Sequence, residues 1–276
     1  MKIRFGYELL YGSTQVTPLV LCLRAAPSPS QRLLVSDVVR TDPFVPVVSS
    51  RDAFGNLCTR LIAPAGTVRI STAGLLDDPG TAEPAFRDAR ETPIANLPAD
   101  TLMYVLPSRY CESDLLAPEA LRLFGYLRRG WSRVQAICDF VHQYVACGGS
   151  PDRQAQTALE TYNAGQGLYQ DMTHLAIAFC RALGIPARYA TGYLDGFGVP
   201  AVDAPVDFPS CVEAFLDGAW HIFEPRNNVR RIGRLIIARG RDAADVAIGS
   251  AFGAATLQQF RLWTDQISDT DAIQAA

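Results

Sequence analysis

The chain has 276 residues, 49% of them hydrophobic, which is enough apolar material for one large domain or two smaller ones. Its 25 basic and 28 acidic residues leave a net charge of −3, with no run of like charges and no basic stripe. This balance argues against a nucleic-acid partner or binding to an anionic membrane. No apolar segment is long enough to cross a bilayer and the N-terminus lacks a secretory signal, so we expect a cytoplasmic protein.

The seven cysteines are an odd number, scattered along the chain, and several lie in apolar runs. This distribution favours reduced, buried thiols over a disulfide framework. No Cys-x-x-Cys pair occurs and the three histidines have no ligand spacing, so we expect neither a zinc site nor another cofactor.

Residues 1–75 form short runs of alternating apolar and polar residues, divided by Gly, Pro, Ser and Asp turns. Such a series of strands predicts a small β-sandwich, with a hairpin turn in the segment RDAFGN, 51–56. An exposed edge of this module could pair with a second subunit, so a homo-oligomer is an open alternative. Residues 76–100 are rich in Pro, Asp, Glu and Ala without periodicity and predict a linker or wrapping loop.

The pattern becomes helical in the third region, 101–276. Apolar residues at three- and four-residue intervals predict helices over 117–130 and 132–149, each closing on glycine. A third helix, 170–183, is apolar nearly all round, which is typical of a buried helix. Alternating runs then predict antiparallel strands at 187–194, 210–216, 219–223, 234–240 and 256–267. The fold class is therefore α+β: an N-terminal β-sandwich followed by a core of helices packed on an antiparallel sheet.

A glycine-rich turn leads into the buried helix and strands follow, which is a layout suited to thiol catalysis. A cysteine at a helix N-terminus is activated by free N–H groups and the helix dipole, and an imidazole on a neighbouring strand completes the site. The chain resembles the bacterial transglutaminase-like superfamily, whose members are described as candidate cysteine proteases with a β-rich N-terminal region and a papain-like core. The resemblance rests on the segments RDAFGN, LPSRYCESD, CRALGIPARYATGYL, DGAWHIFEPRNN and IARGRDAADVAI, which span nearly the whole chain.

The resemblance implies a Cys-His-Asp triad, but this chain departs from it at all three positions. The family motif Gly-x-Cys-x-Asp falls on Gly167, Tyr169 and Asp171, so a tyrosine occupies the nucleophile position. Proline 209 occupies the histidine position and Glu224 that of the aspartate. A phenol has a higher pKa than a thiol and Pro209 supplies no base, so the ancestral mechanism is excluded on this alignment.

Several nearby residues could still act in the cleft. Cys211 shares a strand face with Pro209, so its sulfur could point into the cleft, although a packing role is the simpler interpretation. Glu224 could pair with Arg226 or Arg188, or act as a base. Asp171 and His174 lie three residues apart on a helix and are candidate binding residues, with a structural hydrogen bond as the alternative.

Two functions follow from these substitutions. The first is a pseudoenzyme, a non-catalytic module that binds an unidentified peptide, protein or small molecule. The second is a repurposed enzyme that performs hydrolytic or acyl-transfer-like chemistry through Tyr169, Cys211 and Glu224. The simultaneous loss of nucleophile and base favours the first, because the residues of a triad act as a unit.

Overall fold

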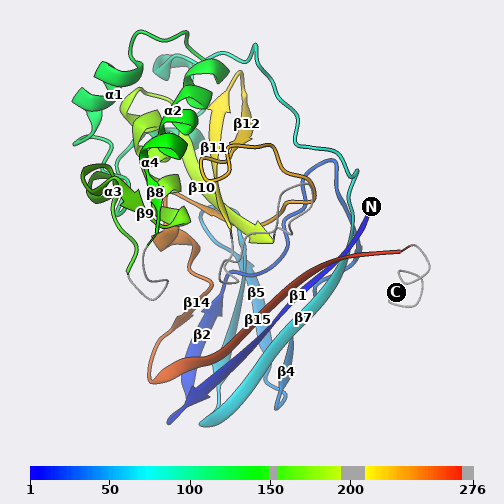
Figure 1. The fold of residues 1–276 in the computed structure, drawn as a ribbon. Coiled ribbons are helices and arrows are strands. Elements are labelled where there is room, and N and C mark those ends of the chain that lie inside the picture. The colour runs from blue at the N-terminus through cyan, green and yellow to red at the C-terminus, as the bar shows by residue number, and fades with distance from the viewer. Residues whose placement is uncertain (149–153, 194–208, 269–276) are drawn as a thin grey trace.

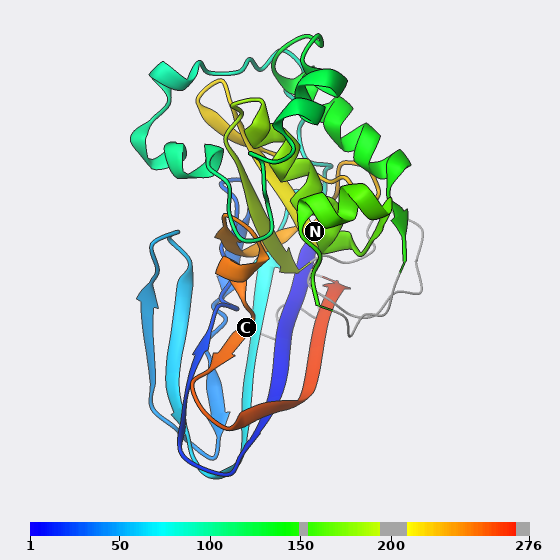
Figure 2. The ribbon, with the colours of Figure 1, turned by 90° about the vertical axis from the view of Figure 1, so that its left-hand side faces the viewer.

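The computed structural model describes residues 1–148, 154–193 and 209–268. In Figures 1 and 2 a β-sandwich lies below and a layer of helices packed on a second β-structure lies above it. This arrangement confirms the predicted α+β class, with a sandwich that begins at the N-terminus and a core of helices on an antiparallel sheet.

The sandwich consists of two antiparallel sheets. One has the order β15-β1-β7-β3, with β4 also paired to β7, and the other has the order β14-β2-β6-β5. Alternation along β1 buries Ile3, Phe5 and Tyr7 between the sheets. The strands are Lys2–Ser13 (β1), Thr17–Leu21 (β2), Arg32–Val35 (β3), Arg40–Asp42 (β4), Val47–Arg51 (β5), Leu57–Ala63 (β6), Gly66–Asp77 (β7), Gly249–Ala251 (β14) and Ala255–Ile267 (β15).

The last two strands return from the core to the sandwich. β15 pairs with β1 along its whole length, from Lys2 opposite Ile267 to Ser13 opposite Ala255, and β14 pairs with β2. The sequence pattern predicts a β module confined to 1–75 and a strand at 256–267 that belongs to the core. Strand periodicity reveals a strand but not its partner, so this long-range pairing could not be read from the pattern.

The core is built around one buried helix. Helix α4 (Tyr169–Ala182) is buried at every position from Asp171 to Arg181, in agreement with the predicted helix over 170–183. It packs on β10 and β11 on one side and on three helices on the other. The remaining core elements are α1 (Ala117–Phe124), α2 (Trp131–Tyr144), α3 (Ala158–Ala164) and the sheet β12-β11-β10-β13, formed by Ala187–Tyr193 (β10), Ser210–Leu216 (β11), Ala219–Phe223 (β12) and Leu235–Gly240 (β13).

Three local features differ from the expectation. Helix α1 ends at Phe124 and does not continue to 130, because the chain turns there, with the Leu127 N–H donating to the Phe124 carbonyl at 3.1 Å. Helix α2 ends at Tyr144, because Ala146–Cys147 (β8) turns away to pair in parallel with Gln166–Gly167 (β9). Helix α3 was not predicted; it is short, and its N-terminus is closed by a capping box between Thr157 and Glu160. Short 3-10 helices lie at Ile94–Asn96, Ala99–Val105 and Ala243–Val246. No helix among the described residues has the length and apolar character needed to span a bilayer.

Candidate functional site

The site lies at the N-terminus of α4, where the start of β11 and the segment after β12 meet the helix. The hydroxyl groups of Ser210 on β11 and Thr173 on α4 lie 2.8 Å apart, and Thr173 also donates to the carbonyl of Tyr169 at 3.1 Å. The segment after β12 reaches the same place through Arg226, which contacts Tyr169. The structure thus brings together the three elements that carry Tyr169, Pro209 and Glu224.

Asp171 shapes the first turn of α4. One oxygen of its carboxylate accepts a hydrogen bond from the Leu168 N–H at 2.7 Å, and the other accepts one from the Gln156 N–H at 2.9 Å. The side chain is fully buried. This corrects its assignment as a ligand-binding residue, because a carboxylate committed to the backbone inside the protein does not face a ligand.

Tyr169 is half-buried beneath a cation. The guanidinium carbon of Arg226 lies 3.2 Å from the centroid of the phenol ring, a close cation–π contact. Burial raises the pKa of the Tyr169 phenol above 10, and a hydrogen bond with the Cys147 thiol raises it further. At neutral pH the group is therefore a neutral phenol and not a phenoxide nucleophile.

The thiol beside Tyr169 is a residue that sequence reasoning missed. Cys147 is exposed and lies opposite Gly167 in the β8–β9 pair, where the Gly148 N–H donates to the Gly167 carbonyl at 3.1 Å. No local motif marks Cys147, since the two-residue parallel pair that brings it to Tyr169 joins segments distant in the sequence.

An imidazole supports the loop that covers Tyr169. Nδ1 of His142, an exposed residue on α2, lies 2.7 Å from the carbonyl oxygen of Arg226. This hydrogen bond fixes the backbone from which the Arg226 side chain extends. His142 is thus a neighbour of the site through the loop, a role that no sequence motif indicates.

Pro209 offers the site no side-chain donor or acceptor. Its carbonyl accepts a hydrogen bond from the Thr191 hydroxyl at 3.3 Å. The next residue, Ser210, points its hydroxyl at α4, as its contact with Thr173 requires. No proton acceptor stands at this position in the described structure.

Cys211 does not face the cleft. Side chains alternate along β11, so Cys211 points away from the face on which Ser210 meets α4. It is completely buried in a small apolar cluster with Ala190 and Ile236, and burial raises the pKa of its thiol to about 12. The prediction of a cleft thiol at this position is wrong, and the packing interpretation describes the residue correctly.

Glu224 is paired with arginines, but not with those expected. Its carboxylate accepts from Arg234 at 2.8 Å and lies 3.8 Å from Nε of Arg231. Arg234 also donates to Glu83 at 2.6 Å, from the segment that precedes the core. The predicted partners are occupied elsewhere: Arg226 stacks on Tyr169, and Arg188 pairs with Glu213 at 2.6 Å.

His174 is a buried packing residue. Its ring stacks on Tyr110 with centroids 5.0 Å apart, and its Nε2 accepts from the Ala243 N–H at 3.2 Å. Burial lowers its pKa to about 4, so the ring is neutral at neutral pH. The assignment of His174 as a binding residue is corrected, because the ring has no exposed surface.

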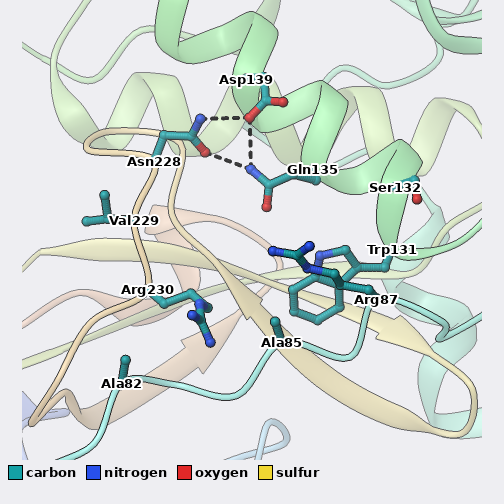
Figure 3. Close-up of a pocket in the computed structure, with 10 residues that line it drawn as sticks. All are labelled: Ala82, Ala85, Arg87, Trp131, Ser132, Gln135, Asp139, Asn228, Val229 and Arg230. Carbon is teal, nitrogen blue, oxygen red and sulfur yellow. Dashed lines mark hydrogen bonds between the residues drawn. The ribbon is translucent and has the colours of Figure 1, made fainter.

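A cavity of about 720 Å³ opens beside the loop that follows β12. Figure 3 shows a hydrogen-bonded group of Asp139, Gln135 and Asn228 at one edge, with bonds of 2.7 to 2.9 Å. Trp131, which is 7% exposed, and the guanidinium groups of Arg87 and Arg230 also line the cavity, together with Ala82, Ala85, Ser132 and Val229 (Figure 3). The cavity therefore combines two cations with one carboxylate and the small exposed part of an indole.

Comparison with known proteins identifies similar chains. A family model described as the transglutaminase-like superfamily matches residues 126–225. A crystal structure of a candidate cysteine protease from Cytophaga hutchinsonii has 30% sequence identity and a TM-score of 0.83, covering 97% of this chain and 91% of that one. An uncharacterised protein of Mycobacterium leprae is 33% identical over 94 residues, and the match spans about a third of its length (33%) and 33% of this chain.

Proposed function

This chain belongs to the transglutaminase-like superfamily, and from that premise we propose that it is a non-catalytic binding or partner module. The observation that carries the proposal is the contact between Arg226 and Tyr169 at the N-terminus of α4. An acyl-transfer nucleophile at that position must be accessible and ionisable. Here the position aligned with the nucleophile is a neutral phenol covered by a guanidinium.

The other two aligned positions support the same proposal. Pro209 has no group that can take a proton, and Glu224 is held in a buried ion cluster with Arg234 and Arg231. Triad residues act as a unit, so the loss of nucleophile and base together removes nearly all of the rate enhancement.

We place the ligand in the cavity beside the site. Its volume of about 720 Å³ falls within the range of small-molecule pockets. Arg87 and Arg230 would pair with an anionic group, and the exposed part of the Trp131 indole would contact an apolar or aromatic part. A peptide segment with an acidic side chain or a small aromatic carboxylate has this chemistry.

A gain-of-function experiment tests the loss of catalysis. We expect the wild-type protein to show no amidase or acyl-transfer activity, whereas the triple variant Tyr169→Cys, Pro209→His, Glu224→Asp gains activity on peptide or ester substrates. The matched control is the same variant with Tyr169→Ser, which provides the other two groups without the thiol. Catalysis by the wild-type chain would contradict the proposal, and a folded but inactive triple variant would contradict the alignment.

The exposed Cys147 favours a second candidate function, a repurposed enzyme. Cys211 and Glu224 are buried and Tyr169 is half-buried, whereas its neighbour Cys147 is exposed. After losing its proton to water, the Cys147 sulfur would attack the acyl carbon of a substrate near the N-terminus of α4. The bond to the leaving group breaks, and the leaving group takes the proton of the Tyr169 phenol.

Activity and thiol reactivity separate the two candidates. A repurposed enzyme predicts turnover that Cys147→Ser abolishes and rapid modification of Cys147 by iodoacetamide at neutral pH, since both need a thiolate. If the chain is a binding module, we expect Cys147 to be modified at the rate of a small free thiol such as glutathione. We then expect no turnover by the wild-type protein or by Cys147→Ser. Tyr169→Phe is the matched variant, because it removes the hydroxyl and leaves the ring.

We also propose a cytoplasmic location. Its support is that all seven cysteines are free thiols, as expected in a reducing compartment. Fractionation of cells that express the tagged chain tests this, and recovery outside the cytoplasm would contradict it.

A further inference from the structure

Three potential metal ligands meet in the β-sandwich, outside the site described above. The thiols of Cys22 and Cys58 and the carboxylate of Asp52 each offer one ligand atom, and these atoms all lie within 4.8 Å of one another. The two sulfur atoms are 2.9 Å apart, and the Cys58 sulfur lies 3.8 Å from Oδ2 of Asp52.

The fold brings this cluster together from separate segments. Strands β2 and β6 are antiparallel with Leu21 opposite Thr59, so Cys22 directly faces Cys58 across the pair. Asp52 comes from the turn between β5 and β6. No short-spaced ligand motif could reveal this convergence.

Hydrogen bonds hold the carboxylate toward the sulfurs. Oδ1 of Asp52 accepts from the Phe54 and Asn56 N–H groups at 2.8 and 2.9 Å, and Oδ2 accepts from the Asn56 side chain at 2.9 Å. The Asn56 amide is itself fixed by two bonds of 2.7 and 2.8 Å to the backbone of Arg239 in the core sheet. Outer hydrogen bonds of this kind orient the ligands in protein metal sites.

We propose that Cys22, Cys58 and Asp52 bind one borderline-soft divalent cation such as Zn²⁺, with water in the fourth position. Two sulfurs and an oxygen are a ligand set that zinc accepts. Around a tetrahedral zinc with bonds of about 2.3 Å to sulfur, the two sulfurs lie about 3.8 Å apart, so they separate by roughly 1 Å on binding.

Binding is accompanied by loss of two thiol protons. Burial raises the pKa of the Cys22 thiol to about 12 and also raises that of Cys58, so both are protonated before the ion arrives. Each sulfur loses its proton to the buffer, keeps the electron pair of the broken S–H bond and donates this pair to the ion. The bound ion would join β2 to the β5–β6 turn, and through Asn56 to the core.

Titration of the reduced full-length protein with Co²⁺ tests the proposal, because thiolate coordination produces a sulfur-to-cobalt charge-transfer band. We expect one equivalent to bind and Zn²⁺ to displace it. Cys22→Ser and Cys58→Ser should abolish the band, and Asp52→Asn should weaken binding by about tenfold or more. Cys147→Ser is the matched control, since it removes a thiol outside the cluster and should leave the titration unchanged.

A second measurement guards against variants that fail to fold. Zn²⁺ should raise the Tm of the wild-type protein and of Cys147→Ser but not that of Cys22→Ser, because a ligand stabilises only the state that binds it. Equal Co²⁺ binding by wild type and Cys22→Ser would overturn the proposal. So would a protein purified without reductant in which peptide mapping finds Cys22 joined to Cys58 and whose reduced form binds no Co²⁺.

Discussion

The phenol of Tyr169 sits between two groups with opposite effects on its ionisation. Burial and the hydrogen bond that the phenol shares with Cys147 raise its pKa, whereas the positive charge of Arg226 lowers it. The ionisation of Tyr169 therefore depends on its contacts with Cys147 and Arg226 as well as on the presence of a phenol at the nucleophile position.

We predict that Cys147→Ala lowers the pKa of Tyr169 and that Arg226→Gln raises it, because the first removes a hydrogen bond that favours the neutral phenol and the second removes a cation. Titration of the labelled tyrosine ring by NMR measures both shifts. Arg230→Gln is the control on the same loop and should leave the titration unchanged. A shift of the same sign in both variants would show that Tyr169 does not contact these groups as described.

His174 makes stability depend on pH. Its folded-state pKa of about 4 lies below the unfolded value of 6.5, so the unfolded chain binds more protons between these values. The contribution is fully present above pH 6.5 and is lost as the pH falls toward 4, by about 3 kcal/mol in total. We expect His174→Gln to reduce this pH dependence, as measured by urea unfolding from pH 7 to 4. A constant difference between the two proteins across that range would contradict the prediction.

Helix α4 depends on the carboxylate at its start. Asp171→Ala leaves the partly buried N–H groups of Leu168 and Gln156 without their acceptor, and we expect it to cost about 2–3 kcal/mol of unfolding free energy. Urea denaturation measures the loss. The control is Asp88→Ala, whose side chain is fully exposed and which should change stability by about 0.5 kcal/mol at most. An equal loss of unfolding free energy in the two variants would show that Asp171 does not stabilise the start of the helix.

The sheet of the core also connects to the sandwich. Glu213 on β11 pairs with Arg188 at 2.6 Å and with Arg239 at 2.9 Å, and the Arg239 backbone bonds to Asn56 in the β-module turn. Arg188 in turn stacks on Trp220, with its guanidinium carbon 4.0 Å from the ring centroid. These contacts join the core sheet to the β-sandwich, two regions that differ in composition.

We expect Glu213→Ala to destabilise the whole molecule by about 3–5 kcal/mol, since it leaves two arginines without their buried carboxylate. Chemical denaturation measures this change. Asp265→Ala breaks the half-exposed pair with Arg4 and should cost about 1 kcal/mol or less. If the Glu213 variant lost no more unfolding free energy than this control, the ion pairs of Glu213 with Arg188 and Arg239 would not stabilise the fold.

Local patterns were sufficient for most elements of the fold. The strands β11 and β12 begin and end as predicted, and Asp217 and Gly218 have the positive φ angles of 52° and 79° that their hairpin turn requires. The buried helix α4 was visible because its apolar residues cover its whole circumference. Such features follow from the periodicity and conformational preferences of neighbouring residues, which are present in the chain before it folds.

The contacts between residues of the candidate site could not be predicted from local sequence patterns. All seven residues of β11 are buried, so alternation could not tell which face Cys211 shares with the cleft. Glu224 pairs with Arg234 and Arg231, and not with the predicted partners Arg226 and Arg188. Cys147 lies beside Tyr169 because of a two-residue strand pair. Partner choice depends on which surfaces distant segments present to each other after packing, and this information lies in the three-dimensional arrangement and not in any local run of residues.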